Sequence, residues 1–355
     1  VTGNGKSRVF TGGVIGYADL MEGETAVLTT DGVINNSDIT VVNPATASAV
    51  SGIIGQQNRY EATLENTINR GNIKIEQFGD ESRLYVGGLV GKSVKGKLTL
   101  NNTSATSDSN IVNYGDIEAG VVVQRPGAAD FAAGTLYAAG GVAFAEQCET
   151  TITGFNNAGN INVTGENQDL NIYMAGALAY ATSEETVGEG FSLPEPEIVI
   201  ERTLNEGDLS DSRTELTEAE QAGRTRTAGI AKAAGIVAET SVDDGVSIKY
   251  NQNTGIMKAA TAAGIIHTIT GDARIADSSV MYNINLGFVD VKETADNGNS
   301  ITMTKELPVG KDASGIIYNG LGEIGYDPTD VYNGTVGPVL TTYYNLTREH
   351  ALRLE

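Results

Sequence analysis

The residues that most often perform catalysis are scarce in this sequence. The only histidines are His267 and His350, and neither has a second histidine at the spacing of a zinc site. The single cysteine, Cys148, lies in Glu-Gln-Cys-Glu-Thr, with no histidine nearby in the sequence to act as its base. A zinc centre, a Ser-His-Asp triad and a catalytic thiol are therefore disfavoured, and we predict that Cys148 is a buried or incidental cysteine and that His267 lies in the core.

Carboxylates are abundant, and many of them fall in predicted turns. Paired carboxylates can hydrolyse glycosidic bonds, and acidic turns can supply oxygen ligands to Ca²⁺. With 45 Asp and Glu residues, however, pairs occur at almost any spacing, and the chain has neither an EF-hand loop nor a G-G-x-G-x-D array. Calcium binding stays open without a motif to specify it, and we assign no catalytic, cofactor-binding or metal-ligating residue. The turn acids considered are Asp116, Asp208, Asp243, Asp244, Asp272 and Asp277.

Two further regions could contact a ligand. The tyrosines Tyr326, Tyr332, Tyr343 and Tyr344 cluster late in the sequence, where they could stack on sugars or cover the last layer of the fold. We favour the covering role. The charged segment 183–226 is a predicted protruding loop, and it fits both a specific contact site and a tolerated surface insertion.

Composition limits the classes of protein that the chain can represent. The 355 residues include 44 glycines and 7 prolines, so glycine serves turns and close packing rather than a disordered linker. A formal net charge of −22 argues against nucleic acid or an anionic membrane as the main partner. A single cysteine excludes an internal disulfide, and no apolar run is long enough to span a membrane.

Two short sequence motifs alternate along the chain. Their alternation indicates that one repeated structural unit contains both motifs. One reads small-Gly-apolar-apolar, as in Gly-Gly-Leu-Val-Gly at 87–91, and the other reads Asn-x-Gly-polar-apolar, as in Asn-Tyr-Gly-Asp-Ile at 113–117. Successive asparagines of the second motif are 34, 44, 44, 48, 48, 32 and 48 residues apart, which is typical of a solenoid with loop insertions. The repeated positions are Gly13, Gly52, Gly88, Gly141, Gly176, Gly235, Gly264 and Gly315, and Asn35, Asn69, Asn113, Asn157, Asn205, Asn253, Asn285 and Asn333.

This pattern predicts an all-β fold, a single parallel β-helix of about eight irregular three-stranded coils. The glycines of the first motif are expected at coil corners, where a positive φ or a close backbone approach excludes a side chain, and the glycine of the second motif is expected to have a positive φ. The asparagines are expected in turns, stacked into a ladder of amides along the solenoid. A β-propeller is the alternative, because units of this length also suit propeller blades.

The two motifs resemble the GLUG-type repeat of large bacterial surface and secreted proteins. The unit formed by Gly87–Gly91 and Asn113–Ile117 is the closest to that pattern, and the likeness extends over about residues 11–337. The resemblance implies a β-solenoid in an exported protein with an adhesive or scaffold role. It carries over no catalytic residue.

The predicted organisation and function follow from these observations. Residues 1–10 form an N-terminal cap or linker, 11–337 the solenoid with its insertion at 183–226, and 338–355 a C-terminal cap ending in Leu-Glu, which is typical of a cloning remnant. We expect a non-catalytic, exported bacterial surface protein, located extracellularly or on the outer membrane. A protein or glycan is the expected partner, and a glycan-binding or glycan-degrading β-helix is the alternative.

Overall fold

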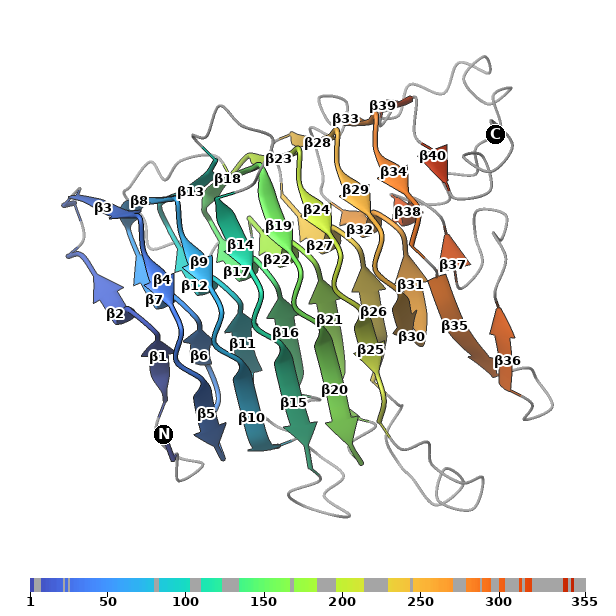
Figure 1. The fold of residues 1–355 in the computed structure, drawn as a ribbon, viewed down its shortest axis with the longest axis horizontal. Helices are drawn as coiled ribbons and strands as arrows, with labels where there is room; N and C mark the ends of the chain where they lie inside the picture. The colour runs from blue at the N-terminus through green and yellow to red at the C-terminus, as the bar shows by residue number, and fades with distance from the viewer. Residues whose placement is uncertain are drawn as a thin grey trace.

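The chain folds into a parallel β-solenoid, as its repeats predict. The computed structural model describes residues 1–2, 8–21, 23–24, 26–79, 83–102, 110–122, 134–166, 169–183, 196–213, 229–242, 245–270, 279–287, 289–294, 300–303, 313–314, 317–320, 341–343 and 346–347. Regular structure in these residues is all strand, in five sheets of eight strands each. With one exception in the last sheet, neighbouring strands in a sheet come from successive coils, which follow one another from the N- to the C-terminus in Figure 1.

Sheets 1 and 2 carry the residues on either side of the small-Gly motif. Every strand pair in them is parallel. Sheet 1 contains β1 (Phe10–Gly12), β6 (Ser48–Ser51), β11 (Arg83–Gly87), β16 (Thr135–Ala139), β21 (Asn171–Ala175), β26 (Ala231–Ala234), β31 (Thr261–Ala263) and β37 (Ala313–Ser314). Sheet 2 contains β2 (Ile15–Asp19), β7 (Ile54–Asn58), β12 (Val90–Val94), β17 (Val142–Glu146), β22 (Leu178–Thr182), β27 (Val237–Ser241), β32 (Ile266–Thr270) and β38 (Ile317–Gly320).

Sheets 3, 4 and 5 complete each coil. Sheet 3 contains β3 (Ala26–Asp31), β8 (Tyr60–Glu65), β13 (Lys97–Asn101), β18 (Glu149–Thr153), β23 (Ile198–Glu201), β28 (Val246–Lys249), β33 (Ser279–Met281) and β39 (Thr341–Tyr343). Sheet 4 contains β4 (Ile34–Asn35), β9 (Ile68–Asn69), β14 (Ile111–Asn113), β19 (Phe155–Asn157), β24 (Leu204–Asn205), β29 (Gln252–Asn253), β34 (Ile284–Asn285) and β40 (Leu346–Thr347). Sheet 5 contains β5 (Ile39–Val42), β10 (Ile73–Phe78), β15 (Ile117–Val121), β20 (Ile161–Gly165), β25 (Leu209–Asp211), β30 (Met257–Ala259), β35 (Val289–Thr294) and β36 (Ser300–Met303), the last of which is antiparallel to β35.

Each of the first seven coils has five strands, so the prediction of three was wrong. The sequence signal was missed because the extra strands lie inside the two motifs themselves. The small-Gly motif divides one apolar stretch into a strand of sheet 1 and a strand of sheet 2, as at β11 and β12. The asparagine of the second motif belongs to sheet 4, whose strands are only two or three residues long, too short to show an alternation in the sequence.

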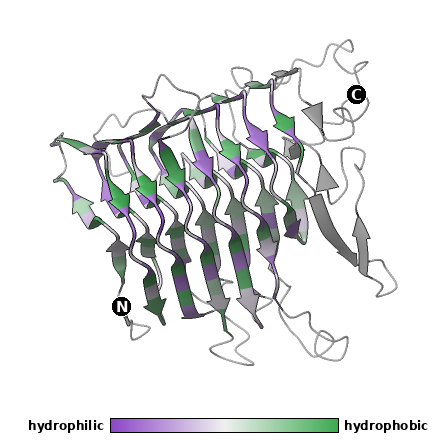
Figure 2. Cartoon of the chain, viewed as in Figure 1, coloured by the Kyte–Doolittle hydropathy of each residue, from purple (hydrophilic) through white to green (hydrophobic). Residues whose placement is uncertain are grey.

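The coils enclose two hydrophobic cores and bury a third cluster outside them. One core lies inside sheets 2, 3 and 4 and includes Leu89 and Leu98, and the other lies inside sheets 5 and 1 and includes Ile73 and Leu84. Hydrophobic and hydrophilic residues alternate along many strands in Figure 2, since successive side chains point to opposite faces. The third cluster lies between the outer faces of sheets 1 and 2 and contains Tyr85.

The asparagines of the second motif form the predicted ladder inside the solenoid. In each described rung the side-chain Nδ2 donates to Oδ1 of the next asparagine, at 2.7–2.9 Å from Asn35 through to Asn285. The same Nδ2 also donates to the carbonyl oxygen two residues ahead, as from Asn113 to Gly115 at 3.0 Å. The ladder therefore fixes the register of seven coils.

The eighth coil departs from the predicted motif positions. Thr347 pairs with Asn285, so Asn333, which lies outside the described residues, is not the eighth member of this column. The strands β39 and β40 pair in parallel with β33 and β34, and the solenoid thus continues past residue 337 into the predicted cap. Gly315 also lies outside the described residues, directly after Ser314, which pairs with Ala263.

Close backbone approach, and not a positive φ, explains the glycines of both motifs. A Cβ on Gly115 would lie 2.0 Å from the carbonyl oxygen of Gly71 in the preceding coil, and its φ is outside the left-handed region. A Cβ on Gly88 would lie 2.1 Å from the carbonyl oxygen of Gly140 and 2.5 Å from Cγ of Asn113. The expectation of a positive φ at the Asn-x-Gly glycine was therefore wrong, because coil-to-coil stacking is what excludes the side chain.

Register also corrects one predicted glycine position. Ala139 pairs with Gly87, so Gly140 occupies the stacked column with Gly88, and Gly141 does not. Gly141 instead lies at the inward position that Leu89 holds in the preceding coil. The ring of Phe155 approaches within 3.2 Å of the point where a Cβ of Gly141 would stand, and so fills the space that the missing side chain leaves.

The stacked glycines give a direct mutational prediction. We expect Gly115→Ala to lower the free energy of unfolding by roughly 3 kcal/mol or more, because the new methyl group would meet backbone that cannot move alone. Gly120→Ala in the same coil is the matched control, since its Cβ would have no neighbour closer than 3.4 Å. Urea unfolding followed by circular dichroism measures both changes, and equal midpoints for the two variants would contradict the explanation.

Candidate functional site

An aromatic strip lies between the outer faces of sheets 1 and 2. Tyr85, Tyr137 and Tyr173 occupy equivalent positions on sheet 1, while Phe144 and Tyr180 do so on sheet 2. Ring centroids of neighbouring members are 4.8–5.4 Å apart in stacked, tilted and edge-on arrangements. Tyr85, Tyr137 and Phe144 are buried, so their faces are used for packing and are not available to a ligand.

Two lysines lie beside the rings of this aromatic strip, and each forms an ion pair with a glutamate. Lys92 Nζ lies 4.9 Å from the ring centroid of Tyr85 and 2.8 Å from a carboxylate oxygen of Glu146. Lys232 makes an ion pair with Glu239 and lies 5.4 Å from the ring of Tyr173. Both ammonium groups are therefore held by a carboxylate and an aromatic face, an arrangement that stabilises a charge at low exposure.

His267 lies beside the second of these pairs and performs a structural role. It is 1% exposed, and its ring nitrogens lie 2.8 Å from Thr261 Oγ1 and 2.7 Å from Thr268 Oγ1. The prediction that it is buried holds, but it belongs to the cluster between sheets 1 and 2, at the position of Ala238 in the preceding coil. Burial, together with the positive charge of Lys232, holds the pKa of His267 well below its usual value.

The low pKa of His267 predicts that stability falls in mild acid. The unfolded chain takes up a proton near pH 6.5, whereas the folded chain resists it, so stability is present above about pH 6.5 and is lost as the pH falls below it. Between pH 7.5 and 5.0 the loss should reach at most about 2 kcal/mol for this one group. Urea midpoints at the two pH values, compared with those of His267→Gln, isolate the effect. An identical pH dependence in the variant would contradict it.

Cys148 is buried, as predicted. It is 1% exposed, its Sγ lies 3.0 Å from Oγ of Ser93, and burial raises the pKa of its thiol. A high pKa and the lack of access both oppose the thiolate form that a nucleophile requires. Cys148 is therefore a core residue.

The acidic turns of the Asn-x-Gly motif form a second, exposed ladder. Oδ1 of Asp116 accepts from the backbone N–H of Asn160 at 2.8 Å, and Oδ1 of Asn160 accepts from the N–H of Asp208 at 2.9 Å. The same contact continues from Asp38 to Asn72 and from Asp208 to Ile256. Aspartate alternates with asparagine in these rungs, which keeps the carboxylates two coils apart and limits their repulsion.

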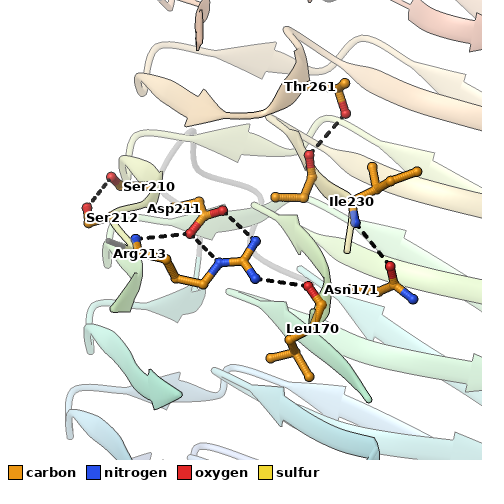
Figure 3. A network of polar contacts seen from close by, with 9 residues as sticks. Leu170, Asn171, Ser210, Asp211, Ser212, Arg213, Ile230 and Thr261 are labelled. Carbon is orange, nitrogen blue, oxygen red and sulfur yellow. Dashed lines mark hydrogen bonds and ion pairs between the residues drawn. The ribbon is translucent and has the colours of Figure 1, made fainter. Parts of the chain in front are cut away.

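A buried ion pair that the sequence reasoning missed lies where sheet 5 leads toward the next strand of sheet 1. Asp211 pairs with Val163 of the preceding coil, whose side chain points into the core. Arg213 binds the carboxylate of Asp211 through Nε and Nη2 at 2.9 and 2.8 Å (Figure 3). The side chains are 11% and 3% exposed. Nη1 of Arg213 also donates to the carbonyl oxygen of Leu170 at 3.0 Å. The pair closes this corner of the coil and performs no evident chemistry.

The tyrosines singled out late in the sequence lie mostly outside the described residues. Tyr343 ends strand β39, whereas Tyr326, Tyr332 and Tyr344 lie outside the described residues.

Several other predicted positions also lie beyond what the structure describes. They are His350, Asp243, Asp244, Asp272, Asp277 and, within the insertion 183–226, residues 184–195 and 214–226.

A different pair of tyrosines is exposed on the turn between sheets 3 and 4. The rings of Tyr250 and Tyr282 stack with centroids 5.0 Å apart and planes 3° apart. They are 55% and 39% exposed. The sequence carried a signal for them in the repeated pattern Tyr-Asn-x-Asn, at 250–253 and at 282–285. This pair is the candidate binding surface.

No metal site or membrane-spanning helix is found in the described ranges. Those residues contain no group of three or more His, Cys, Asp or Glu side chains placed to hold a metal ion. They also contain no helix that is long and apolar enough to cross a bilayer. Comparison with models of protein families, with curated proteins and with solved structures found no match to this chain.

Proposed function

We propose that this chain is a non-catalytic segment of an exported bacterial cell-surface protein that acts as an adhesin or scaffold. The observation that carries the proposal is the amide ladder from Asn35 to Asn285, which ties successive coils into one rigid element. The residues best able to catalyse support it too, since His267 and Cys148 are both buried among structural partners. The surface location rests on the resemblance of the repeats to those of bacterial surface proteins.

An adhesion assay tests this proposal. Fluorescent beads coated with the chain are expected to be retained on mucin, on collagen or on whole bacterial cells more strongly than beads coated with albumin. Retention equal to that of albumin on all three surfaces would count against an adhesive role. Release of new reducing ends from a polysaccharide by the purified chain would contradict a non-catalytic one.

A glycan-binding β-helix is the second candidate, and one observation favours it. Tyr250 and Tyr282 present aromatic surface to solvent, whereas the aromatic strip between sheets 1 and 2 is packed against itself. Exposed aromatic rings are a common means of holding sugar rings, because an apolar ring face packs well against the C–H groups of a pyranose.

A further inference from the structure

The turn that carries Tyr250 and Tyr282 has a left-handed backbone conformation. The φ angles of Tyr250 and Tyr282 are 60° and 58°, and that of Arg202 in the preceding coil is 52°. In earlier coils the corresponding turn uses residues suited to this conformation, including Gly32, Asn66 (φ 46°) and Gly154. A bulky side chain in this region costs about 1–2 kcal/mol relative to glycine. The chain thus accepts strain at three successive turns, which present Arg202, Tyr250 and Tyr282.

Buried asparagines hold this turn in place from the inside. Asn251 and Asn283 follow the two tyrosines and are 1% and 0% exposed. Nδ2 of Asn251 donates to Oδ1 of Asn283 at 3.0 Å and to the carbonyl oxygen of Ile200 at 3.0 Å. Nδ2 of Asn283 donates to the carbonyl oxygen of Ile248 at 2.9 Å. In earlier coils this inward position is apolar at Ile111 and Phe155 and is a buried threonine at Thr67 and Thr203, whereas asparagine follows both Tyr250 and Tyr282.

The arrangement offers a rigid aromatic surface beside a cation. Tyr250 is the more exposed of the two rings, and the exposed Arg202 lies on its other side, one coil away along the column. A rigid ring loses little conformational entropy when it binds, and a guanidinium donates to hydroxyl and carboxylate oxygens alike. A pyranose ring has both an apolar face and such oxygens.

We propose that Tyr250 and Tyr282, with Arg202, form a binding site for a glycan chain, with a sugar ring packed on Tyr250 and its oxygens bound by Arg202. The inference rests on the adhesive function proposed above and assigns its ligand class and its site. It also explains why the strained conformation is filled with tyrosine where glycine or asparagine would be easier to accommodate.

The conformation of the turn allows a binding test that does not weaken the fold. In the double variant Tyr250→Asn/Tyr282→Asn, both rings are removed and replaced by a residue that accepts a positive φ, so we expect a urea midpoint equal to or above that of the wild-type chain. Tyr114→Asn is the matched control, because Tyr114 is 52% exposed but is not among the positive-φ residues. The probes are immobilised xylan, chitin and polygalacturonate.

The wild-type chain is expected to bind at least one of these three polysaccharides. The double variant should bind at least about tenfold more weakly, which corresponds to about 1.4 kcal/mol, while Tyr114→Asn should bind as the wild type does. Failure of the wild-type chain to bind any probe would overturn the site, as would equal binding by the double variant. The bead assay separates the two proposals: if the beads adhere but no probe is bound, the adhesive function stands and the glycan site fails.

Discussion

Replacing Asn113 with alanine is expected to lower the free energy of unfolding by about 4 kcal/mol. Its side chain makes three hydrogen bonds inside the solenoid: Oδ1 accepts from Asn69, and Nδ2 donates to Asn157 and to the carbonyl oxygen of Gly115. Asn113 is 0% exposed, so water cannot replace these partners in the folded chain. Each buried group left without a partner costs about 1–3 kcal/mol, which makes the broken rung costly.

Asn72→Ala is the matched control for the ladder. Asn72 belongs to the neighbouring motif, but its Oδ1 accepts a single exposed hydrogen bond, from the N–H of Asp116 at 3.0 Å. Its loss should cost roughly 1 kcal/mol or less, because water takes the place of the side chain. Urea unfolding followed by circular dichroism compares the two variants. Similar destabilisation by both variants would contradict the prediction that the buried ladder contributes more to stability than the exposed hydrogen bond of Asn72.

Replacing Arg213 with methionine is expected to cost about 3–5 kcal/mol, because it leaves the Asp211 carboxylate buried without its cation. The double variant Asp211→Val/Arg213→Met should recover most of that loss. Asp211 stands in a column whose other members include Val163 and Ala259, so valine restores the pattern of the core. The interaction energy obtained from the double-mutant cycle should therefore be several kcal/mol.

The exposed ion pair between Lys74 and Glu76 serves as the comparison. Their side chains are 48% and 40% exposed, against 3% and 11% for Arg213 and Asp211. Lys74→Met is expected to change the free energy of unfolding by less than about 1 kcal/mol, since water solvates the remaining carboxylate. Thermal or urea unfolding measures these three variants and Asp211→Val, the second single variant that the double-mutant cycle needs. A double variant as unstable as Arg213→Met alone would contradict the account of the buried pair.

The repeats predicted the solenoid because every coil must place like residues on like residues. Stacking explains why Gly88 and Asn113 recur, and it made the ladder predictable from spacing alone. The same reasoning erred at Gly141, where two adjacent glycines allowed two alignments. Only the register of β16 with β11 distinguishes them.

The sequence by itself determined the class of fold, the repeat unit and the columns that fill its interior, since those depend on residue types that recur at matching positions. Other features were decided only by the tertiary structure, because a local sequence pattern does not encode them. The five strands of a coil, the close contact that requires Gly115, and the pairing of Asp211 with Arg213 inside the wall depend on backbone register and on contacts between coils. So does the exposure of Tyr250 and Tyr282: their chemistry is visible in the sequence, but only the stacked coils place the two rings face to face at the surface.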